Sequence, residues 1–229
     1  MKLLASGRDG DIYEYAPGLV LRKTRDGRSI EHEARIIEYV EQFDYPVPKV
    51  HEVRANGSEI IMERIDGPLM FDDSPTALLK TPKMFRILAD LHDQLHEIPA
   101  PDWVRVIGEG DRLLHVDLHP LNVIMSPTRG PVVIDWSNAA RGDPLFDIGL
   151  TYVLLTCPTI PIPRPIQIVA DLARGTLARQ FFARRYRGLA FDQAVVDAAS
   201  LKVFDRNMQP EEIARMERLI RQKQKRALG

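Results

Sequence analysis

The first 65 residues alternate short hydrophobic stretches with turn residues. Glycine-containing pairs typical of tight turns separate these stretches at Pro17-Gly18, Asp26-Gly27 and Asn56-Gly57. The stretches with strand character are Ile12–Tyr15, Leu19–Lys23, Val50–Val53 and Glu59–Glu63. Between the second and the third of these stretches, apolar residues recur at the spacing of a helix. Residues 1–65 therefore predict a small, sheet-rich lobe with one helix.

From Lys83 onward the hydrophobic period becomes that of helices. The apolar positions of the first helical segment are Met84, Ile87, Leu88, Leu91 and Leu95. Segments that begin at Ile166 and Pro210 also have helical character, and three β-like segments lie between the helices: Leu113–Leu118, Asn122–Met125 and Pro131–Trp136. We expect residues 66–229 to form a larger, mainly helical lobe. The predicted fold class is α+β, with two lobes.

Composition limits the classes of function. The chain has 229 residues, of which 45% are hydrophobic, so it can bury a sizeable core. A net charge of −1 argues against general nucleic-acid binding, which needs many cations to neutralise phosphates. The longest apolar run, Ile148 to Cys157, is shorter than the roughly 18 residues that span a bilayer. With a single cysteine and no apolar leader at the N-terminus, we expect a cytoplasmic protein without a membrane partner.

Residues of the type that transfers phosphoryl groups cluster around the β-like segments. His115, Asp117 and Asn122 have the H-x-D-x-x-x-x-N spacing of a kinase catalytic loop, and Asp135 follows an apolar strand. Phosphoryl transfer needs a carboxylate beside the acceptor hydroxyl and hard oxygen ligands for magnesium. Asp and Asn are also common in turns and caps. The ordered occurrence of the whole set favours a kinase.

A glycine-containing segment near the N-terminus follows the pattern of a kinase phosphate-binding loop, except that Ala5 replaces the first glycine. The segment is Ala5-Ser6-Gly7-Arg8-Asp9-Gly10-Asp11-Ile12. Gly7 and Gly10 would let the backbone come close to the phosphates of a nucleotide. An ordinary hairpin turn is the alternative interpretation.

Kinases also hold the α- and β-phosphates with a cation on the third strand, which pairs with a glutamate on the next helix. Adjacent strand residues point to opposite faces, so either Arg22 or Lys23 can serve. We favour Arg22; the alternative is a solvated charge pair on an edge strand. The following helix has the apolar face Ile30, Ala34, Ile37 and Val40. Glu33 falls within that face, which makes it the predicted partner of Arg22.

Together these segments resemble the aminoglycoside phosphotransferase and choline kinase family, which has a protein-kinase-like fold. The resemblance covers most of residues 1–155. It rests on His115-Val116-Asp117-Leu118-His119-Pro120-Leu121-Asn122-Val123, Ile134-Asp135-Trp136 and Gly142-Asp143-Pro144 followed by Asp147. The chain departs from the family at Val116 and Leu121, where glycine is usual, and at Arg22, where lysine is usual. We expect the two loop departures to alter packing more than chemistry.

The resemblance implies a role for each residue of the catalytic segment. Asp117 orients the acceptor hydroxyl and accepts its proton, while Asn122 and Asp135 bind magnesium. Asp147 braces the catalytic loop from inside a buried helix. Histidines of a catalytic loop are more often hydrogen-bonded scaffold residues than acids or bases, so for His115 and His119 we favour the scaffold role over a direct chemical one. The family also binds the adenine edge through backbone groups between the lobes, which here implies the carbonyl of Glu63 and the N–H of Ile65.

We therefore expect a small-molecule kinase that uses ATP or GTP with Mg²⁺ and phosphorylates a hydroxyl of an unidentified acceptor. A polycationic aminoglycoside would need clustered carboxylates, for which the candidates are Asp66, Asp72, Asp73, Asp102, Glu109 and Asp111. The alternative function is a non-catalytic nucleotide-binding module, motivated by Ala5 and Arg22. Retention of Asp117, Asn122 and Asp135 opposes it. The sequence leaves the oligomeric state open.

Overall fold

The computed structural model describes residues 1–7, 10–71, 77–158, 164–186, 188–205 and 208–227. The chain divides into two compact units. Unit 1 comprises Met1–Phe71 and Leu121–Ala139, and unit 2 comprises Asp72–Pro120 and Ala140–Gly229. The sequence placed one division after residue 65, whereas the structure adds a later segment to the N-terminal unit. The functional assignment of the lobes, nucleotide to 1–65 and acceptor to 66–229, stays a prediction.

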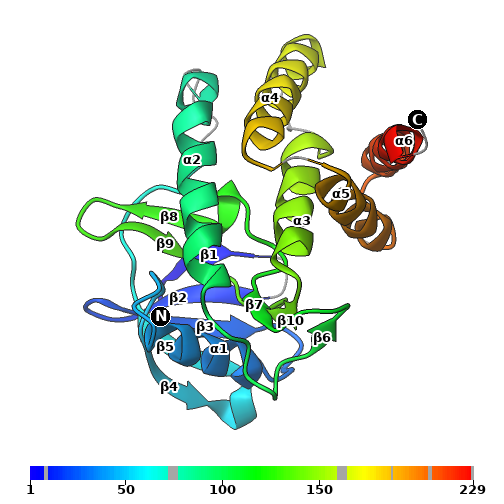
Figure 1. Cartoon of the computed structure of the whole chain (residues 1–229). Helices are drawn as coiled ribbons and strands as arrows, with labels where there is room; N and C mark the ends of the chain where they lie inside the picture. The colour runs from blue at the N-terminus through cyan, green and yellow to red at the C-terminus, as the bar shows by residue number, and fades with distance from the viewer. Residues whose placement is uncertain (8–9, 72–76, 159–163, 187, 206–207, 228–229) are drawn as a thin grey trace. The chain divides into compact units, whose positions relative to one another are not determined.

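Unit 1 is built on a five-stranded antiparallel sheet with the order β1-β2-β3-β5-β4 (Figure 1). Its strands are β1 Leu3–Ser6, β2 Gly10–Ala16, β3 Leu19–Thr24, β4 Val50–Arg54 and β5 Glu59–Glu63. The last four confirm the predicted strands to within two residues at either end. The sequence did not predict β1, because this four-residue edge strand is exposed along its whole length and has no buried face to create a period.

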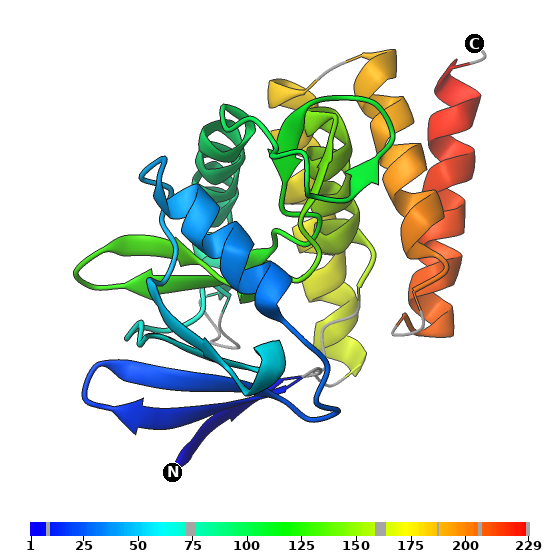
Figure 2. The ribbon, with the colours of Figure 1, turned by 90° about the horizontal axis from the view of Figure 1, so that it is seen from below.

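Helix α1, Glu31–Glu41, contacts β4, and Figure 2 shows it running along the sheet of unit 1. Its buried side chains are Glu33, Ala34, Ile36, Ile37 and Val40. The predicted apolar face is thus confirmed, including the unusual carboxylate within it. A buried carboxylate is costly unless a cation compensates it, so this helix must place Glu33 against one.

A hairpin of β8, Val123–Ser126, and β9, Gly130–Val133, belongs to unit 1 although it follows the first α-helix of unit 2. Three backbone hydrogen bonds of 2.8 Å attach it: Met70 N–H to Val123 O, Met125 N–H to Pro68 O and Val133 N–H to Pro46 O. Gly67 permits the approach, because a Cβ there would lie 2.4 Å from Met125 O. These long-range bonds explain why the division of the chain differs from the predicted one.

Unit 2 is mainly helical, as predicted. Its helices are α2 Ala77–His96, α3 Pro144–Thr156, α4 Arg164–Arg185, α5 Leu189–Lys202 and α6 Pro210–Ala227. A small sheet, β6-β10-β7, joins Val106–Ile107, Ala140–Gly142 and Arg112–Leu114. Helix α3 is the predicted buried helix and packs closely on α5, since a Cβ at Gly149 would lie 2.8 Å from Ala194 O. No helix among the described residues is long and apolar enough to cross a membrane.

Candidate active site

Asp147 on α3 holds the backbone immediately before Asp117. Its side chain is fully buried, and its two oxygens accept hydrogen bonds from consecutive backbone N–H groups. The His115 nitrogen lies 3.0 Å from Oδ2, and the Val116 nitrogen lies 2.8 Å from Oδ1. One carboxylate therefore fixes the direction in which the chain enters Asp117, a geometry consistent with the brace that the family resemblance implies.

Val116 has a φ of +62°, in the left-handed region that L-residues rarely adopt. Such a conformation costs on the order of 1–3 kcal/mol and is most unfavourable for a β-branched residue. The expected strand over Leu113–Leu118 is therefore wrong beyond Leu114, where β7 ends. The family position that glycine usually occupies does require a glycine-like backbone, which here the two bonds to Asp147 maintain.

Two histidines that sequence analysis missed surround Asp147. His96 Nε2 lies 3.2 Å from Asp147 Oδ2, and His92 Nε2 lies 2.8 Å from Thr151 Oγ1. The Thr151 hydroxyl gives its proton to Leu118 O at 2.7 Å, so His92 must donate to Thr151. This chain ties α2 and α3 to the backbone beside Asp117. The available signal was the four-residue spacing of the two histidines, which places them on one face of a helix.

Burial decides the charge of these groups. Desolvation lowers the pKa of His92 to about 3, so its imidazole is neutral at pH 7. Burial would raise the pKa of Asp147, but the hydrogen bond from His96 and the neighbouring imidazoles outweigh it and leave the pKa lowered. The ligand atoms of His92, His96 and Asp147 lie within 4.8 Å of one another. Because the Asp147 oxygens already accept three hydrogen bonds, we assign this cluster a structural role and no metal.

The side chain of Asp117 is largely buried and lies near two cationic or titratable side chains of unit 2. Its Oδ1 is 3.8 Å from His119 Nε2 and 3.9 Å from Lys202 Nζ. Lys202 also forms an ion pair of 2.8 Å with Asp205. Sequence analysis missed Lys202 and Asp205, because these residues follow the segment with family resemblance and no local pattern marks them. Lys202 adds a cation beside the predicted base.

In unit 1, Arg22 joins the predicted glutamate to the predicted metal ligand. Its Nη1 lies 2.7 Å from Glu33 Oε1, and its Nη2 lies 3.5 Å from Asp135 Oδ1. Lys23 points to the other face of the sheet, where it pairs with Glu59 at 2.9 Å and remains half-exposed. The predicted Arg22–Glu33 pair and the strand register are therefore confirmed. The contact of Arg22 with phosphate stays a prediction.

Asn122 and Asp135 flank the same end of the β8–β9 hairpin. Val123 is paired with Val133, and the Ile134 N–H donates to the Asn122 carbonyl at 3.0 Å. Asp135 has a φ of +64° and accepts a hydrogen bond of 2.9 Å from Ser137 Oγ. Its side chain is 39% exposed, so its oxygens remain accessible. An amide oxygen and an accessible carboxylate are ligands that magnesium prefers, and the pair fits that ion.

The glycine-containing segment forms a turn between β1 and β2, in which the Gly7 N–H donates to Gly10 O at 2.9 Å. Residues 8 and 9 lie outside the described residues. A Cβ at Gly10 would lie 2.4 Å from Lys23 O, so strand packing alone requires this glycine. At Gly7 the nearest contact would be an ordinary 3.5 Å. Of the two glycines, Gly7 is thus the one whose small size the fold leaves unexplained.

Arg25, which sequence analysis did not single out, anchors this turn. Its guanidinium donates to Gly7 O at 2.8 Å and pairs with Asp11 at 2.7 Å. The hydrogen bond from Arg25 lowers the pKa of the Asp11 carboxyl. The turn that we expect to cover phosphates therefore has a second arginine at its base.

The connecting segment after β5 contains the predicted base-binding groups. The Glu63 carboxylate accepts from the Lys49 N–H at 3.1 Å and pairs with Arg129, so its side chain is occupied within unit 1. Within the described part of the chain, the Ile65 N–H has no hydrogen-bond partner. This geometry is compatible with recognition of a base through the backbone, which stays a prediction.

Comparisons with known proteins identify the family. The model of the phosphotransferase enzyme family matches residues 105–189, and the RIO domain model matches residues 22–143, more than half of the chain. No curated protein sequence matches. Three similar solved structures show that the fold is protein-kinase-like.

The first is a thermostable mutant of aminoglycoside phosphotransferase APH(4)-Ia with AMP-PNP and hygromycin B (TM-score 0.67, 16% identity, 99% of this chain and 94% of that chain). The second is a choline/ethanolamine kinase family protein from Mesorhizobium loti (TM-score 0.58, 14% identity, 98% and 87%). The third is the GDP complex of a mutant aminoglycoside 2'-phosphotransferase-IIIa (TM-score 0.57, 15% identity, 100% and 92%). The two family models overlap on residues 105–143, which carry Asp117, Asn122 and Asp135. The match over more than half of the chain shows that it belongs to the RIO domain family, and its residues 105–189 are similar to the phosphotransferase enzyme family.

Proposed function

We propose that this protein is a small-molecule kinase that transfers the γ-phosphoryl group of ATP or GTP to a hydroxyl, with Mg²⁺ as cofactor. The observation that carries the proposal is the position of Arg22, which contacts both the buried Glu33 and the accessible Asp135. In kinases such a cation pairs with a helix glutamate and grips phosphate near the metal-binding aspartate. The complexes of similar proteins with AMP-PNP and GDP support nucleotide binding.

The proposed chemistry uses the residues of the catalytic segment. Asp117 accepts the proton of the acceptor hydroxyl while the oxygen of that hydroxyl forms a bond to the γ-phosphorus. The bond between the γ-phosphorus and the oxygen that bridges it to the β-phosphate breaks. The products are a phosphate ester and a nucleoside diphosphate. Asn122 and Asp135 would hold magnesium, which when bound neutralises charge on the β- and γ-phosphates. Asp147 keeps the loop before Asp117 in place through its two backbone bonds.

A polycationic acceptor has little support from the surface carboxylates. Asp66 pairs with Arg64 at 2.8 Å, Asp102 with Arg141 at 3.4 Å and Asp111 with Arg112 at 3.4 Å. Asp72 and Asp73 lie outside the described residues. Because three of the six candidate carboxylates already have an arginine partner, we propose that the acceptor hydroxyl belongs to a small metabolite rather than to an aminoglycoside.

The second candidate function is a nucleotide-binding module without transfer. The observation that favours it is the 3.5 Å contact between Arg22 and Asp135, because a guanidinium there competes with a metal for the same carboxylate. The RIO domain match leaves this alternative open.

A coupled assay for nucleoside diphosphate release distinguishes the two functions. The protein is tested with ATP or GTP and a panel of sugars, amino alcohols and aminoglycosides. A kinase releases diphosphate in an acceptor-dependent manner, and Asp117→Asn lowers turnover by about 10²–10⁴-fold, the range of a positioned general base. Nucleotide affinity should be the same in both proteins. Nucleotide binding with no acceptor-dependent release across the panel would instead support the binding module.

A further inference from the structure

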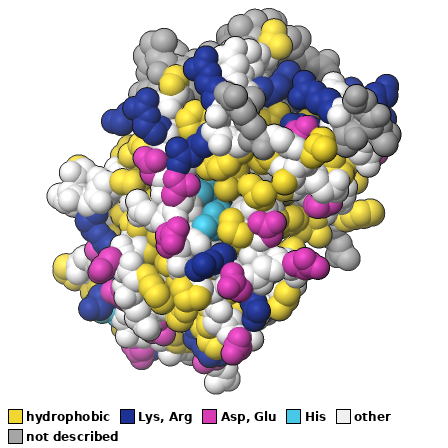
Figure 3. Space-filling model, in the orientation of Figure 1, with side chains coloured by type: hydrophobic (Ala, Val, Ile, Leu, Met, Phe, Trp, Pro, Cys, Tyr) yellow, Lys and Arg dark blue, Asp and Glu magenta, His cyan; other side chains and the backbone are white. Residues whose placement is uncertain are grey.

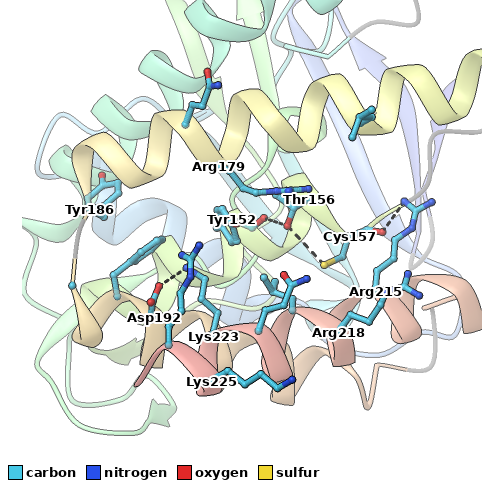
Figure 4. A pocket seen from close by; sticks show the side chains of 17 residues that line it. Tyr152, Thr156, Cys157, Arg179, Tyr186, Asp192, Arg215, Arg218, Lys223 and Lys225 are labelled. Carbon is cyan, nitrogen blue, oxygen red and sulfur yellow. Dashed lines mark hydrogen bonds and ion pairs between the residues drawn. The ribbon is translucent and has the colours of Figure 1, made fainter. Parts of the chain in front are cut away.

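Helices α3, α4, α5 and α6 of unit 2 line a partly open cavity of about 1030 Å³ (Figure 4). Pockets that bind small molecules commonly measure about 300–1,000 Å³, so this cavity has room for a ligand of nucleotide size. Side chains from all four helices line it, among them Tyr152 on α3, Arg179 on α4, Phe191 on α5 and Arg218 on α6. We call it the α3–α6 cavity.

The described lining of the α3–α6 cavity is strongly cationic. Its basic residues are Arg179, Arg215, Arg218, Lys223, Lys225 and Arg226. Asp192 is the one carboxylate among the described lining residues, and it is already paired with Lys223. Figure 3 shows lysine and arginine side chains gathered where α4 and α6 lie in Figure 1. The charge of the cavity is therefore far from balanced within the described residues.

Among the described residues, most of these cations form no ion pair or hydrogen bond. Arg215 donates to Cys157 O at 3.3 Å, whereas Arg179, Arg218, Lys225 and Arg226 make no ion pair or hydrogen bond with another described residue. The helix dipole favours cations in the last turn of a helix, which explains the positions of Lys225 and Arg226 in α6. It does not explain the positions of Arg179 and Arg218, which lie outside the last turns of their helices. In Figure 4 the Arg179 side chain extends from α4 toward Thr156. Because these side chains are exposed, a dissolved anion can reach them, and cations of one sign gathered around a cavity attract such an anion.

Aromatic rings form a second part of the lining. Tyr152, Tyr186 and Phe191 all line the cavity, and their rings belong to one packed cluster. Lys223 Nζ lies 5.5 Å from the ring centres of both Tyr152 and Phe191. A ligand here would meet cations on one side and flat apolar surfaces on the other.

We propose that the α3–α6 cavity binds a small molecule that carries two or more phosphate groups. Arginine guanidinium groups from α4 and α6 suit phosphate oxygens, to which they donate in pairs. The rings of α3 and α5 would contact the body of the ligand. A partly open cavity of this volume, with exposed arginines at its rim, fits a small molecule better than a nucleic-acid duplex.

This site is separate from Asp117. Asp147 binds the backbone beside Asp117, and nine residues further along α3 Thr156 lines the cavity. At 1.5 Å per residue these positions are about 13 Å apart along the helix. Helix α5 shows a similar separation. Lys202 lies near Asp117, and Asp192, which lines the cavity, is about 15 Å from Lys202 along the helix. The cavity therefore lies away from the proposed base, and the proposal does not depend on the kinase reaction.

Calorimetric titration with sodium pyrophosphate, without nucleotide and at constant ionic strength, tests the proposal. The variant Arg179→Gln/Arg218→Gln removes one cavity arginine from α4 and one from α6. The control Arg184→Gln/Arg221→Gln removes the same charge from the same helices at positions that are also exposed but lie outside the cavity lining. We expect the cavity pair to lower pyrophosphate affinity at least tenfold and the control pair less than threefold. Equal affinities in the two variants, or no binding to the unaltered protein at millimolar pyrophosphate, would overturn the proposal.

Two further readouts guard against a variant that misfolds. Without anion, the cavity pair should melt no lower than the control pair, because it removes repulsion between like charges. In the unaltered protein, saturating pyrophosphate should raise the Tm without nucleotide or magnesium, because a ligand that binds only the folded state stabilises it. An unchanged Tm would contradict the proposal without any substitution.

Discussion

The ammonium nitrogen of Lys202 lies 3.9 Å from a carboxylate oxygen of Asp117, although the two residues are far apart in sequence. Lys202 ends α5 and is fixed by its 2.8 Å ion pair with Asp205. Both side chains of the Lys202–Asp117 pair are mostly buried, so solvent screens their interaction less than at an exposed surface. The last turn of α5 thus supplies a positive charge beside the proposed base.

Lys202→Met should lower acceptor turnover about tenfold, because the ammonium would no longer hold the Asp117 carboxylate in position; a factor of ten corresponds to about 1.4 kcal/mol of barrier. The KM for nucleotide should stay unchanged, which separates this positioning role from a general loss of structure. Asp205→Asn serves as the control, since it leaves the cation in place and should reduce kcat less. A kcat of Lys202→Met within twofold of the unaltered protein would contradict the prediction.

Arg22→Gln should destabilise the protein by roughly 3–5 kcal/mol, since it leaves Glu33 buried without its cation. Lys23→Gln should leave the free energy of unfolding nearly unchanged, because the Lys23–Glu59 pair is solvent-screened. Urea denaturation measures both. The double variant Arg22→Gln/Glu33→Gln should regain much of the lost stability while nucleotide affinity stays weak. Recovery of affinity together with stability would exclude Arg22 from phosphate binding.

Magnesium and ATP should stabilise the protein together. At about 100 times the dissociation constant the gain is roughly 2.7 kcal/mol, or several degrees in Tm at about 2–4 °C per kcal/mol for a chain of this size. Asp135→Ala should remove most of the magnesium-dependent part, because that carboxylate is accessible at the end of the β8–β9 hairpin. Thermal denaturation with ATP plus Mg²⁺ and with ATP plus EDTA measures the effect. If millimolar ATP and Mg²⁺ leave the Tm of the unaltered protein unchanged, nucleotide binding is wrong.

Acid should destabilise the protein through His92. Its pKa of about 3 in the folded protein is below the value of 6.5 in the unfolded chain, so below pH 6.5 the unfolded chain binds the proton first. Stability therefore falls as the pH decreases, by up to about 1.4 kcal/mol per pH unit. Asp147 adds to the loss only below pH 3.8, since its pKa is also lowered.

Between pH 7 and 5 the His92 contribution amounts to about 2 kcal/mol. Urea denaturation at several pH values should therefore give a shallower pH dependence for His92→Gln than for the unaltered protein. His51→Gln, at an exposed position, should keep the original dependence. Parallel curves for His92→Gln and the unaltered protein would show that His92 is not the titrating group.

Local pattern was enough for much of unit 1. Alternation located four of its five strands, and helical spacing placed Glu33 on the buried face of α1 opposite Arg22. These inferences succeed because a strand and a helix each impose a short period on the side chains that must be buried. The β1 strand escaped detection because nothing along it is buried.

The motif residues could also be identified from their spacing, since Asp117, Asn122 and Asp135 occur in an order that few other sites require. The residues that contact and position the catalytic loop could not be identified in this way. His92 and His96 on α2 and Lys202 on α5 approach the loop from distant parts of the chain. No local rule states which helix will meet a given loop.

What the sequence determined by itself is the set of elements and the chemistry of the loop, because both depend on neighbours a few residues apart. The tertiary structure alone decided that the β8–β9 hairpin joins unit 1, that Val116 adopts a left-handed backbone and that cations of α4 and α6 converge on one cavity. These features arise from hydrogen bonds and packing between segments far apart in the chain. Such contacts leave no periodic trace in the sequence.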